Sequence, residues 1–160
     1  MTKNREIEYG VKIKNSNKLI SYLNSNAVNK GTIKSTRKIF KKLKSDYFFR
    51  TDQQTQGSKN KYFFSMKEDI LLKKGVRNGM KVSDEIDIEV SSSQLKKLEE
   101  IVILLGFNQT NIISKTRRTY FVGKLMVTID SYPDNDYLEI EGTNKKDIMN
   151  LVSRLPIEKI

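Results

Sequence analysis

The sequence contains no cysteine and no histidine among its 160 residues. Without cysteine the chain has no disulfide, no thiolate nucleophile and no zinc-finger ligand. Without histidine it has no Ser-His-Asp or Cys-His catalytic centre, no histidine base and no imidazole metal ligand. Any bound metal ion must therefore be held by oxygen atoms, which favour hard cations such as magnesium, manganese or calcium.

Long apolar segments are also missing. No apolar run approaches the length that spans a bilayer, and the first residues, MTKNREIEY, lack the apolar stretch of a secretion signal. We therefore expect a cytoplasmic protein with no membrane partner. The length fits one domain, residues 1–160, and suffices for a hydrophobic core.

Acidic residues are scarce relative to basic ones, with 19 Asp and Glu against 30 Lys and Arg and a formal net charge of +11. Such an excess favours a polyanionic partner, which is nucleic acid, a phosphate group or an anionic surface. Solubility explains the same excess without any partner, and composition alone does not choose among these explanations.

Three segments have the apolar spacing of helices, namely residues 16–24, 91–107 and 143–155. In the second, Ser91 and Gln94 form a capping-box pattern, and Gly106 is suited to end the helix. The remainder resembles strands and turns, with hairpins around Gly57 and Gly123 and loops at residues 24–32 and 75–82. We predict an α+β domain with helices packed outside a largely antiparallel sheet.

The scarce acids gather on three strand-like segments, EIEYGVKI, EIDIEV and LEIEG. Alternation places the acids of each segment on one face and its apolar side chains on the other; the acids are Glu6, Glu8, Glu85, Asp87, Glu89, Glu139 and Glu141. An ordinary sheet with one wet face explains any single segment. Three such strands side by side would repel one another unless cations lay between them.

Basic residues occur inside other strand-like segments, in SDYFFRTD, KYFFSMKE and KTRRTYFV. A closed sheet with acids and bases facing inward would form a charged lumen. Such a lumen suits metal ions on one wall and a polyphosphate on the other.

The segment KTRRTYFVGKLMVTIDSYPDNDYLEIEG resembles the CYTH family, the triphosphate tunnel metalloenzymes, which include class IV adenylate cyclases, thiamine triphosphatases and inorganic triphosphatases. EIDIEV with the following helix ending in LLGF matches the same family, and EIEYGVKI stands where these proteins carry a Glu-x-Glu-x-Lys signature. The resemblance implies an antiparallel β-barrel of about eight strands, open as a tunnel with the helices outside.

The resemblance also implies roles for single residues. The implied metal ligands for Mg²⁺ or Mn²⁺ are Glu6, Glu8, Asp130, Glu139 and Glu141. The implied phosphate-binding residues are Arg50, Lys67, Lys115 and Arg117, with Glu85 and Asp87 lining the tunnel. The implied catalytic residues are Lys12, Lys115 and Arg117.

Three positions depart from the family pattern. Gly10 replaces the lysine of the signature, Phe48 replaces one of two paired arginines, and Ser83 replaces an arginine before the acidic pair. Each replacement removes a phosphate contact. The candidates to compensate are Lys12, Lys81 and Arg118.

These observations lead to a metal-dependent enzyme that processes a triphosphate such as ATP, tripolyphosphate or thiamine triphosphate, as a monomer or homodimer. The first choice is a class IV adenylate cyclase that forms cAMP and pyrophosphate, and the alternative is an inorganic or thiamine triphosphatase. A non-catalytic binder of triphosphates or triphosphorylated RNA is a rival hypothesis. General nucleic-acid binding through KIFKKLKSDYFF ranks last, because an exposed basic strand edge explains that stretch more simply.

Overall fold

The computed structural model describes residues 4–69 and 80–158 of the chain. Its strands are β1 (Asn4–Ile13), β2 (Val28–Lys41), β3 (Tyr47–Gln56), β4 (Lys59–Asp69), β5 (Met80–Val90), β6 (Gln109–Val122), β7 (Leu125–Ser131) and β8 (Asp136–Gly142). Its helices are α1 (Asn17–Asn26), α2 (Ser92–Leu104) and α3 (Lys145–Val152).

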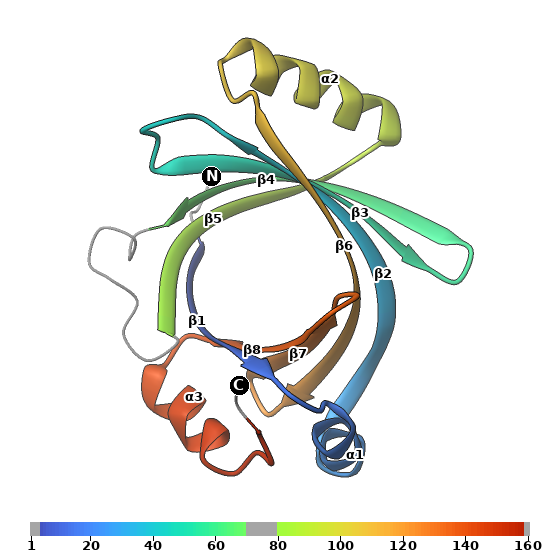
Figure 1. Cartoon of the computed structure of the whole chain (residues 1–160), viewed down its shortest axis with the longest axis vertical. Coiled ribbons are helices and arrows are strands. Elements are labelled where there is room, and N and C mark those ends of the chain that lie inside the picture. The colour runs from blue at the N-terminus through green and yellow to red at the C-terminus, as the bar shows by residue number, and fades with distance from the viewer. Residues whose placement is uncertain (1–3, 70–79, 159–160) are drawn as a thin grey trace.

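The strands form a closed barrel in the order β1-β5-β4-β3-β2-β6-β7-β8, and every pairing is antiparallel (Figure 1). The helices lie outside the barrel wall. The predicted α+β class, eight-stranded antiparallel barrel and outer helices are therefore confirmed. None of the helices in the described part of the chain is long and apolar enough to cross a membrane.

The apolar core lies outside the barrel rather than inside it. Leu19 and Leu23 of α1 and Ile148 and Leu151 of α3 are buried in one cluster with the outward-facing side chains of β1, β7 and β8. The apolar faces predicted for EIEYGVKI and LEIEG pack in this cluster, represented by Tyr9, Ile13, Leu138 and Ile140. Alternation then directs the acidic faces of the same strands toward the lumen.

The predicted hairpins and the long helix are confirmed. Gly57 and Gly123 connect β3 to β4 and β6 to β7 with φ values of 60° and 59°, a left-handed conformation that glycine adopts without steric cost. Ser91 and Gln94 form the predicted capping box at the start of α2. These features depend on neighbours in sequence, so local patterns predicted them.

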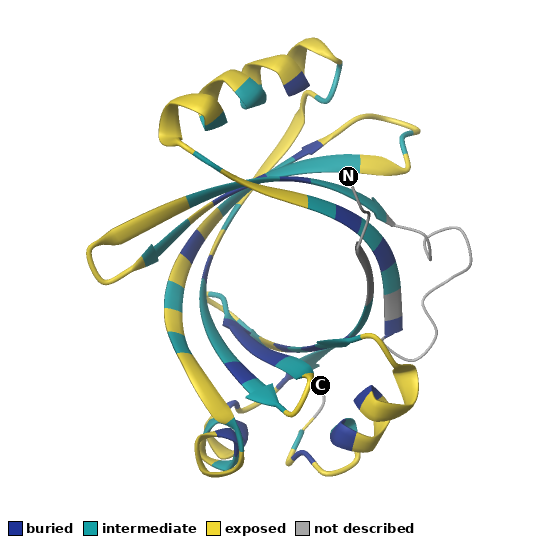
Figure 2. Cartoon of the chain, turned by 180° about the vertical axis from the view of Figure 1, so that it is seen from behind, coloured by how far each residue is buried: buried dark blue, intermediate teal, exposed yellow. Residues whose placement is uncertain are grey.

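The strand β2 was not predicted. Residues 24–32 were expected to form a loop, but β2 begins at Val28, and its hydrogen-bonded partners are β3 and β6. Its sequence, VNKGTIKSTRKIFK, shows little alternation because one face meets a charged lumen and the other is largely exposed (Figure 2). Since β2 is paired on both sides, the expected exposed strand edge at KIFKKLK is wrong.

Candidate functional site

A cavity of about 280 Å³ lies inside the barrel, and all eight strands contribute to its lining. The lining residues are Glu8, Arg37, Arg50, Asp52, Gln54, Phe63, Ser65, Lys67, Glu85, Asp87, Arg117, Met126, Glu139 and Glu141. Eight of the residues proposed from sequence are among them: Glu8, Arg50, Lys67, Glu85, Asp87, Arg117, Glu139 and Glu141.

The basic side chains of the lining come from four consecutive strands of the barrel. Lys67, Arg50, Arg37 and Arg117 stand on β4, β3, β2 and β6 in that order. We call these four side chains the basic wall. Such a row offers charge-assisted hydrogen bonds to several phosphate oxygens at once.

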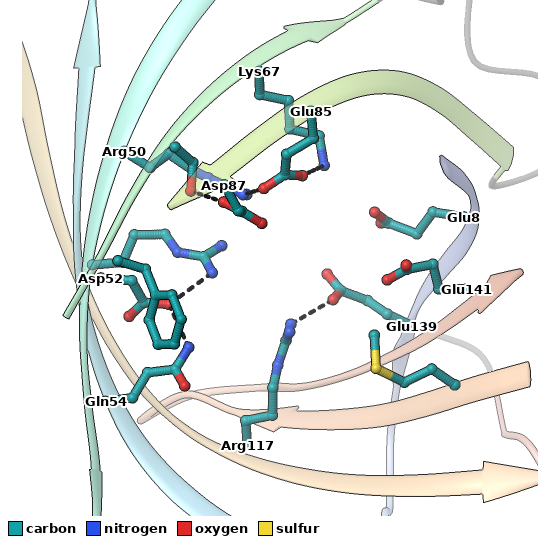
Figure 3. A pocket seen from close by; sticks show the side chains of 14 residues that line it. Glu8, Arg50, Asp52, Gln54, Lys67, Glu85, Asp87, Arg117, Glu139 and Glu141 are labelled. Atoms are coloured by element: carbon teal, nitrogen blue, oxygen red, sulfur yellow. Dashed lines mark hydrogen bonds and ion pairs between the residues drawn. The ribbon is translucent and has the colours of Figure 1, made fainter. Parts of the chain in front are cut away.

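The carboxylates of β8, β1 and β5 form the other side of the cavity. We define Glu8, Glu139 and Glu141 as the acidic wall, and Figure 3 shows these three grouped on one side of the cavity. Glu8 and Glu141 are direct register partners, and Glu139 stands opposite Gly10. A side chain added at Gly10 would place its Cβ 3.5 Å from Glu8 Oε1, so glycine leaves space beside this carboxylate.

Glu85 of β5 joins two residues of the basic wall. It accepts hydrogen bonds or ion pairs from Arg50 and from Lys67, whose Nζ lies 3.1 Å from Glu85 Oε2 (Figure 3). The neighbouring Asp87 accepts a hydrogen bond from the hydroxyl of Ser65. Glu85 therefore lies between two cations of the cavity, Arg50 and Lys67, and holds both.

Asp130 lies beneath Arg117 and does not reach the cavity surface. Its carboxylate is fully buried, accepts from Nε and Nη2 of Arg117 at 2.6 Å each, and also pairs with Lys115. Arg117 Nη2 additionally donates to Glu139 Oε2 at 2.6 Å. Asp130 thus orients Arg117 toward the acidic wall, and the predicted metal-ligand role does not fit its place.

Burial alone would favour the neutral form of Asp130, but the hydrogen bonds and charge of Arg117, aided by Lys115, outweigh it and lower the pKa of Asp130. Burial and the nearby Arg117 charge lower the pKa of Lys115, although Asp130 opposes this shift. Burial raises the pKa of Tyr132 to about 12. The ring of Tyr132 lies 5.9 Å from Lys115 Nζ.

Lys115 and Lys12 are not in the cavity lining. Lys115 is 8% exposed, pairs with Asp130 and lies outside the cavity lining. Its predicted direct contact with a phosphate in this cavity therefore does not fit its place. Lys12 pairs in register with Tyr137, beyond the residues of the acidic wall. The side chain of Glu6 lies outside the described part of the structure, although its backbone pairs with Ser83.

The replacements at Phe48 and Ser83 have different surroundings. Phe48 lies near the start of β3 with Lys41 Nζ 5.9 Å from its ring centre, and it does not line the cavity. Ser83 is buried on β5. Of the candidates to compensate, Arg118 contacts Ser131 rather than the cavity, and the side chain of Lys81 is outside the described residues.

Sequence reasoning missed Arg37 and Asp52. Arg37 Nη2 donates to Asp52 Oδ2 at 3.0 Å, and Asp52 also accepts from Ser35 at 2.5 Å and from Gln54 at 3.2 Å. Burial opposes ionisation of Asp52, but the Arg37 charge and these hydrogen bonds lower its pKa. Asp52 and Gln54 alternate with Arg50 along β3, so the strand period was a signal that they face the lumen as Arg50 does. Arg37 could be placed in the lumen only once β2 was known to be a strand.

Arg37 retains an unused donor. Among the described residues its buried Nε has no hydrogen-bond partner in the protein. A buried donor without an acceptor costs free energy, which a phosphate oxygen at this position would recover.

A divalent ion fits the donor chemistry of the acidic wall. In the described part of the chain, no three acidic side chains are grouped closely enough to hold an ion by themselves. Magnesium is commonly bound by one or two carboxylates together with substrate phosphates. Glu8 and Glu141, adjacent in register, match that mode of binding.

Comparison with solved structures finds the same fold at low sequence identity. The PH1012 protein of Pyrococcus horikoshii has a TM-score of 0.73 and 20% identity, covering 94% of this chain and 91% of that one. HpAC1 of Hippeastrum, described as a candidate adenylyl cyclase with a dominant triphosphatase activity, has a TM-score of 0.66 and 16% identity, with coverages of 92% and 84%. A candidate adenylate cyclase of Vibrio parahaemolyticus has a TM-score of 0.61 and 12% identity, with coverages of 96% and 85%.

No family model and no curated protein sequence matches this chain. The structural neighbours include two proteins described as candidate cyclases, one of them with triphosphatase activity, and this chain shares their fold.

Proposed function

We propose that this protein is a divalent-metal-dependent triphosphatase that hydrolyses a triphosphate inside its barrel. The observation that carries the proposal is the charge arrangement of the cavity, with a basic wall of four side chains and carboxylates on the neighbouring strands. A linear polyanion that lies along the basic wall would exchange the present carboxylate partners of Arg50, Lys67 and Arg117 for phosphate oxygens.

The charge balance of the lining supports the requirement for a metal ion. Among the described residues, six carboxylates and four basic groups line the cavity, an excess of two formal negative charges before any ligand enters. A triphosphate adds further negative charge, and like charges a few ångströms apart repel strongly where water is scarce. Added cations are therefore needed, and Mg²⁺ or Mn²⁺ at Glu8 and Glu141 supplies them next to the phosphates.

The chain's own residues supply binding, orientation and charge compensation. Arg117, held from below by Asp130, and Arg37, held by Asp52, enter the cavity with fixed orientation and can stabilise charge on the leaving phosphate. When bound, the divalent ion would neutralise phosphate charge and activate the attacking water. With no histidine in the chain, a carboxylate is the available proton acceptor.

Hydrolysis is favoured over cyclisation by the scarcity of apolar lining. A nucleoside binds best against apolar and aromatic surface, whereas Phe63 and Met126 are the only large apolar side chains among the described lining residues. Inorganic tripolyphosphate has no nucleoside and needs no apolar surface for binding. The cyclase remains the second candidate, because the C-terminal motif resembles that branch and two structural neighbours are described as candidate cyclases.

A substrate panel tests the proposal. Purified protein is incubated with tripolyphosphate, thiamine triphosphate or ATP, with magnesium, manganese or a chelator, and phosphate, pyrophosphate and cAMP are quantified. We expect phosphate release from tripolyphosphate that requires the metal. Formation of cAMP with pyrophosphate would favour the cyclase, and tight binding without any product would favour the non-catalytic binder.

Paired variants assign the metal to the acidic wall. Glu8→Gln with Glu141→Gln should remove metal-dependent turnover, because both carboxylates line the cavity. Glu89→Gln is the matched control, since Glu89 is exposed and pairs with Lys61 at the surface. Unchanged turnover and manganese affinity in the double variant would rule out this metal assignment.

A further inference from the structure

An exposed apolar surface lies at the C-terminal end of α2, away from the cavity. The helix buries Val102, whereas Ile101 is 51% exposed, Leu105 57% and Leu104 86%. On the nearby turn between β2 and β3, Leu43 is 74% exposed. We call these four exposed side chains, Leu43, Ile101, Leu104 and Leu105, the apolar tip.

Specific contacts join the two segments that carry the apolar tip. Lys42 Nζ donates to the carbonyl oxygen of Leu105 at 3.2 Å and lies 5.7 Å from the centre of the Phe107 ring. Phe107 also packs edge-on against Phe49 of β3. The turn and the end of α2 are therefore held together, and Leu43 belongs to the same region of surface as Leu105.

The helix α2 is anchored on its opposite side. Glu99 Oε2 accepts from Lys38 Nζ at 2.6 Å, and Glu99 Oε1 accepts from the hydroxyl of Thr51 at 2.8 Å. These contacts fix one face of the helix on the barrel wall. The remaining faces of its last turn, IVILL, stay exposed, as Figure 2 shows by the colour of α2.

Lysines accompany the apolar tip. Residues 41–46, KKLKSD, carry three lysines and one aspartate, and Lys41, Lys42 and Lys44 are all exposed. Lys44 has a φ of 62°, so the turn that displays Leu43 between lysines has a tight left-handed bend. Exposed leucines beside lysines are the chemistry of proteins that adsorb to anionic lipid surfaces.

We propose that the apolar tip docks onto an anionic membrane surface, with the leucines at the level of the acyl chains and the lysines among the headgroups. A second copy of the chain is the less suitable occupant, because a symmetric contact would bring two sets of lysines together on proteins of net charge +11. An anionic bilayer satisfies both the apolar and the basic side chains. This inference differs from the expectation of no membrane partner, and it does not depend on the activity of the barrel.

Vesicle co-sedimentation tests the proposal with the 160-residue chain. Wild type should bind vesicles of phosphatidylcholine mixed with phosphatidylserine, bind pure phosphatidylcholine vesicles much more weakly, and be released by salt. Leu43→Ser with Leu104→Ser should weaken binding at least about tenfold. Both positions are exposed, so the fold should be retained, which circular dichroism checks.

Matched variants distinguish lysines beside the apolar tip from the overall positive charge of the protein as the cause of vesicle binding. Lys41→Gln with Lys44→Gln should weaken binding about tenfold or more, because each lysine near an anionic surface contributes on the order of fivefold. Lys59→Gln with Lys124→Gln, exposed lysines at two other hairpins, should change vesicle binding far less. Equal effects of the two lysine pairs, equal binding to both kinds of vesicle, or no vesicle binding would overturn the proposal. So would a concentration-dependent dimer in light scattering that Leu104→Ser dissolves while vesicle binding stays unchanged.

Discussion

Two buried aspartates hold two of the three arginines of the basic wall, and they differ in how many cations they neutralise. Asp130 on β7 is fully buried and neutralises two cations, Lys115 and Arg117. Asp52 on β3 is 5% exposed and binds one cation, Arg37, with two neutral donors. A buried aspartate thus holds an arginine at two places in the barrel. The loss in free energy of unfolding when the carboxylate is removed should depend on how many cations it leaves without a partner.

The largest effect is expected from Asp130→Asn. The substitution leaves Lys115 and Arg117 near each other without their common carboxylate, and breaking a buried pair in this way costs about 3 kcal/mol or more in the free energy of unfolding. Asp52→Asn should cost about 1 kcal/mol, because its neutral donors can bind water or the amide instead. Urea unfolding measures both.

Asp134→Asn, in the exposed turn between β7 and β8, is the control for Asp130→Asn. Equal losses of stability for Asp130→Asn and Asp52→Asn would show that the number of buried charges does not set the cost.

The next effect concerns ligand affinity. Arg117→Ala should weaken tripolyphosphate binding at least about tenfold, roughly 1.4 kcal/mol, because Arg117 lines the cavity and is preorganised by Asp130. Arg118→Ala should change affinity far less, since Arg118 is outside the cavity lining and contacts Ser131. Calorimetry in the presence of magnesium measures both, and small equal effects would mean that phosphate does not contact the basic wall at β6.

A smaller effect on ligand affinity is expected at Arg37, a basic lining residue that sequence reasoning missed. Arg37→Gln should weaken tripolyphosphate binding about fivefold, roughly 1 kcal/mol, because its unused Nε donor is available to a phosphate oxygen. Lys34→Gln removes the same charge from the exposed face of the same strand and serves as the control. If Lys34→Gln has the larger effect, Arg37 is a structural partner of Asp52 and not a ligand contact.

The smallest effect concerns pH. The pKa values of Asp52 and Asp130 are lowered in the fold, so their stabilisation is fully present above the unfolded value of about 3.9 and is lost as pH falls below it through the folded values. The free energy of unfolding should therefore decrease on acidification below about pH 4. The free energy of unfolding of Asp130→Asn should decrease less steeply than that of wild type over that range. Equal slopes would exclude Asp130 as a source of the pH dependence.

Local patterns were sufficient for much of the fold. The hairpins at Gly57 and Gly123, the capping box at Ser91 and the alternating faces of β1 and β8 depend on residues close together in sequence. The strand β2 was not predictable in this way, because a strand between a charged lumen and solvent has no apolar face to reveal its period.

The sequence by itself determined the chemistry that the site can use. The absence of histidine and cysteine restricts it to oxygen donors and basic side chains, and alternation assigns Glu8, Glu139 and Arg117 to one face of their strands. Only the tertiary structure decided which of these residues meet. Closure pairs β1 with β5 and β8, and β2 with β6, strands far apart in the chain, and this brings Arg37 into the cavity while Asp130 is placed beneath Arg117. Such contacts arise from barrel closure and depth in the wall, which the period of a single strand does not encode.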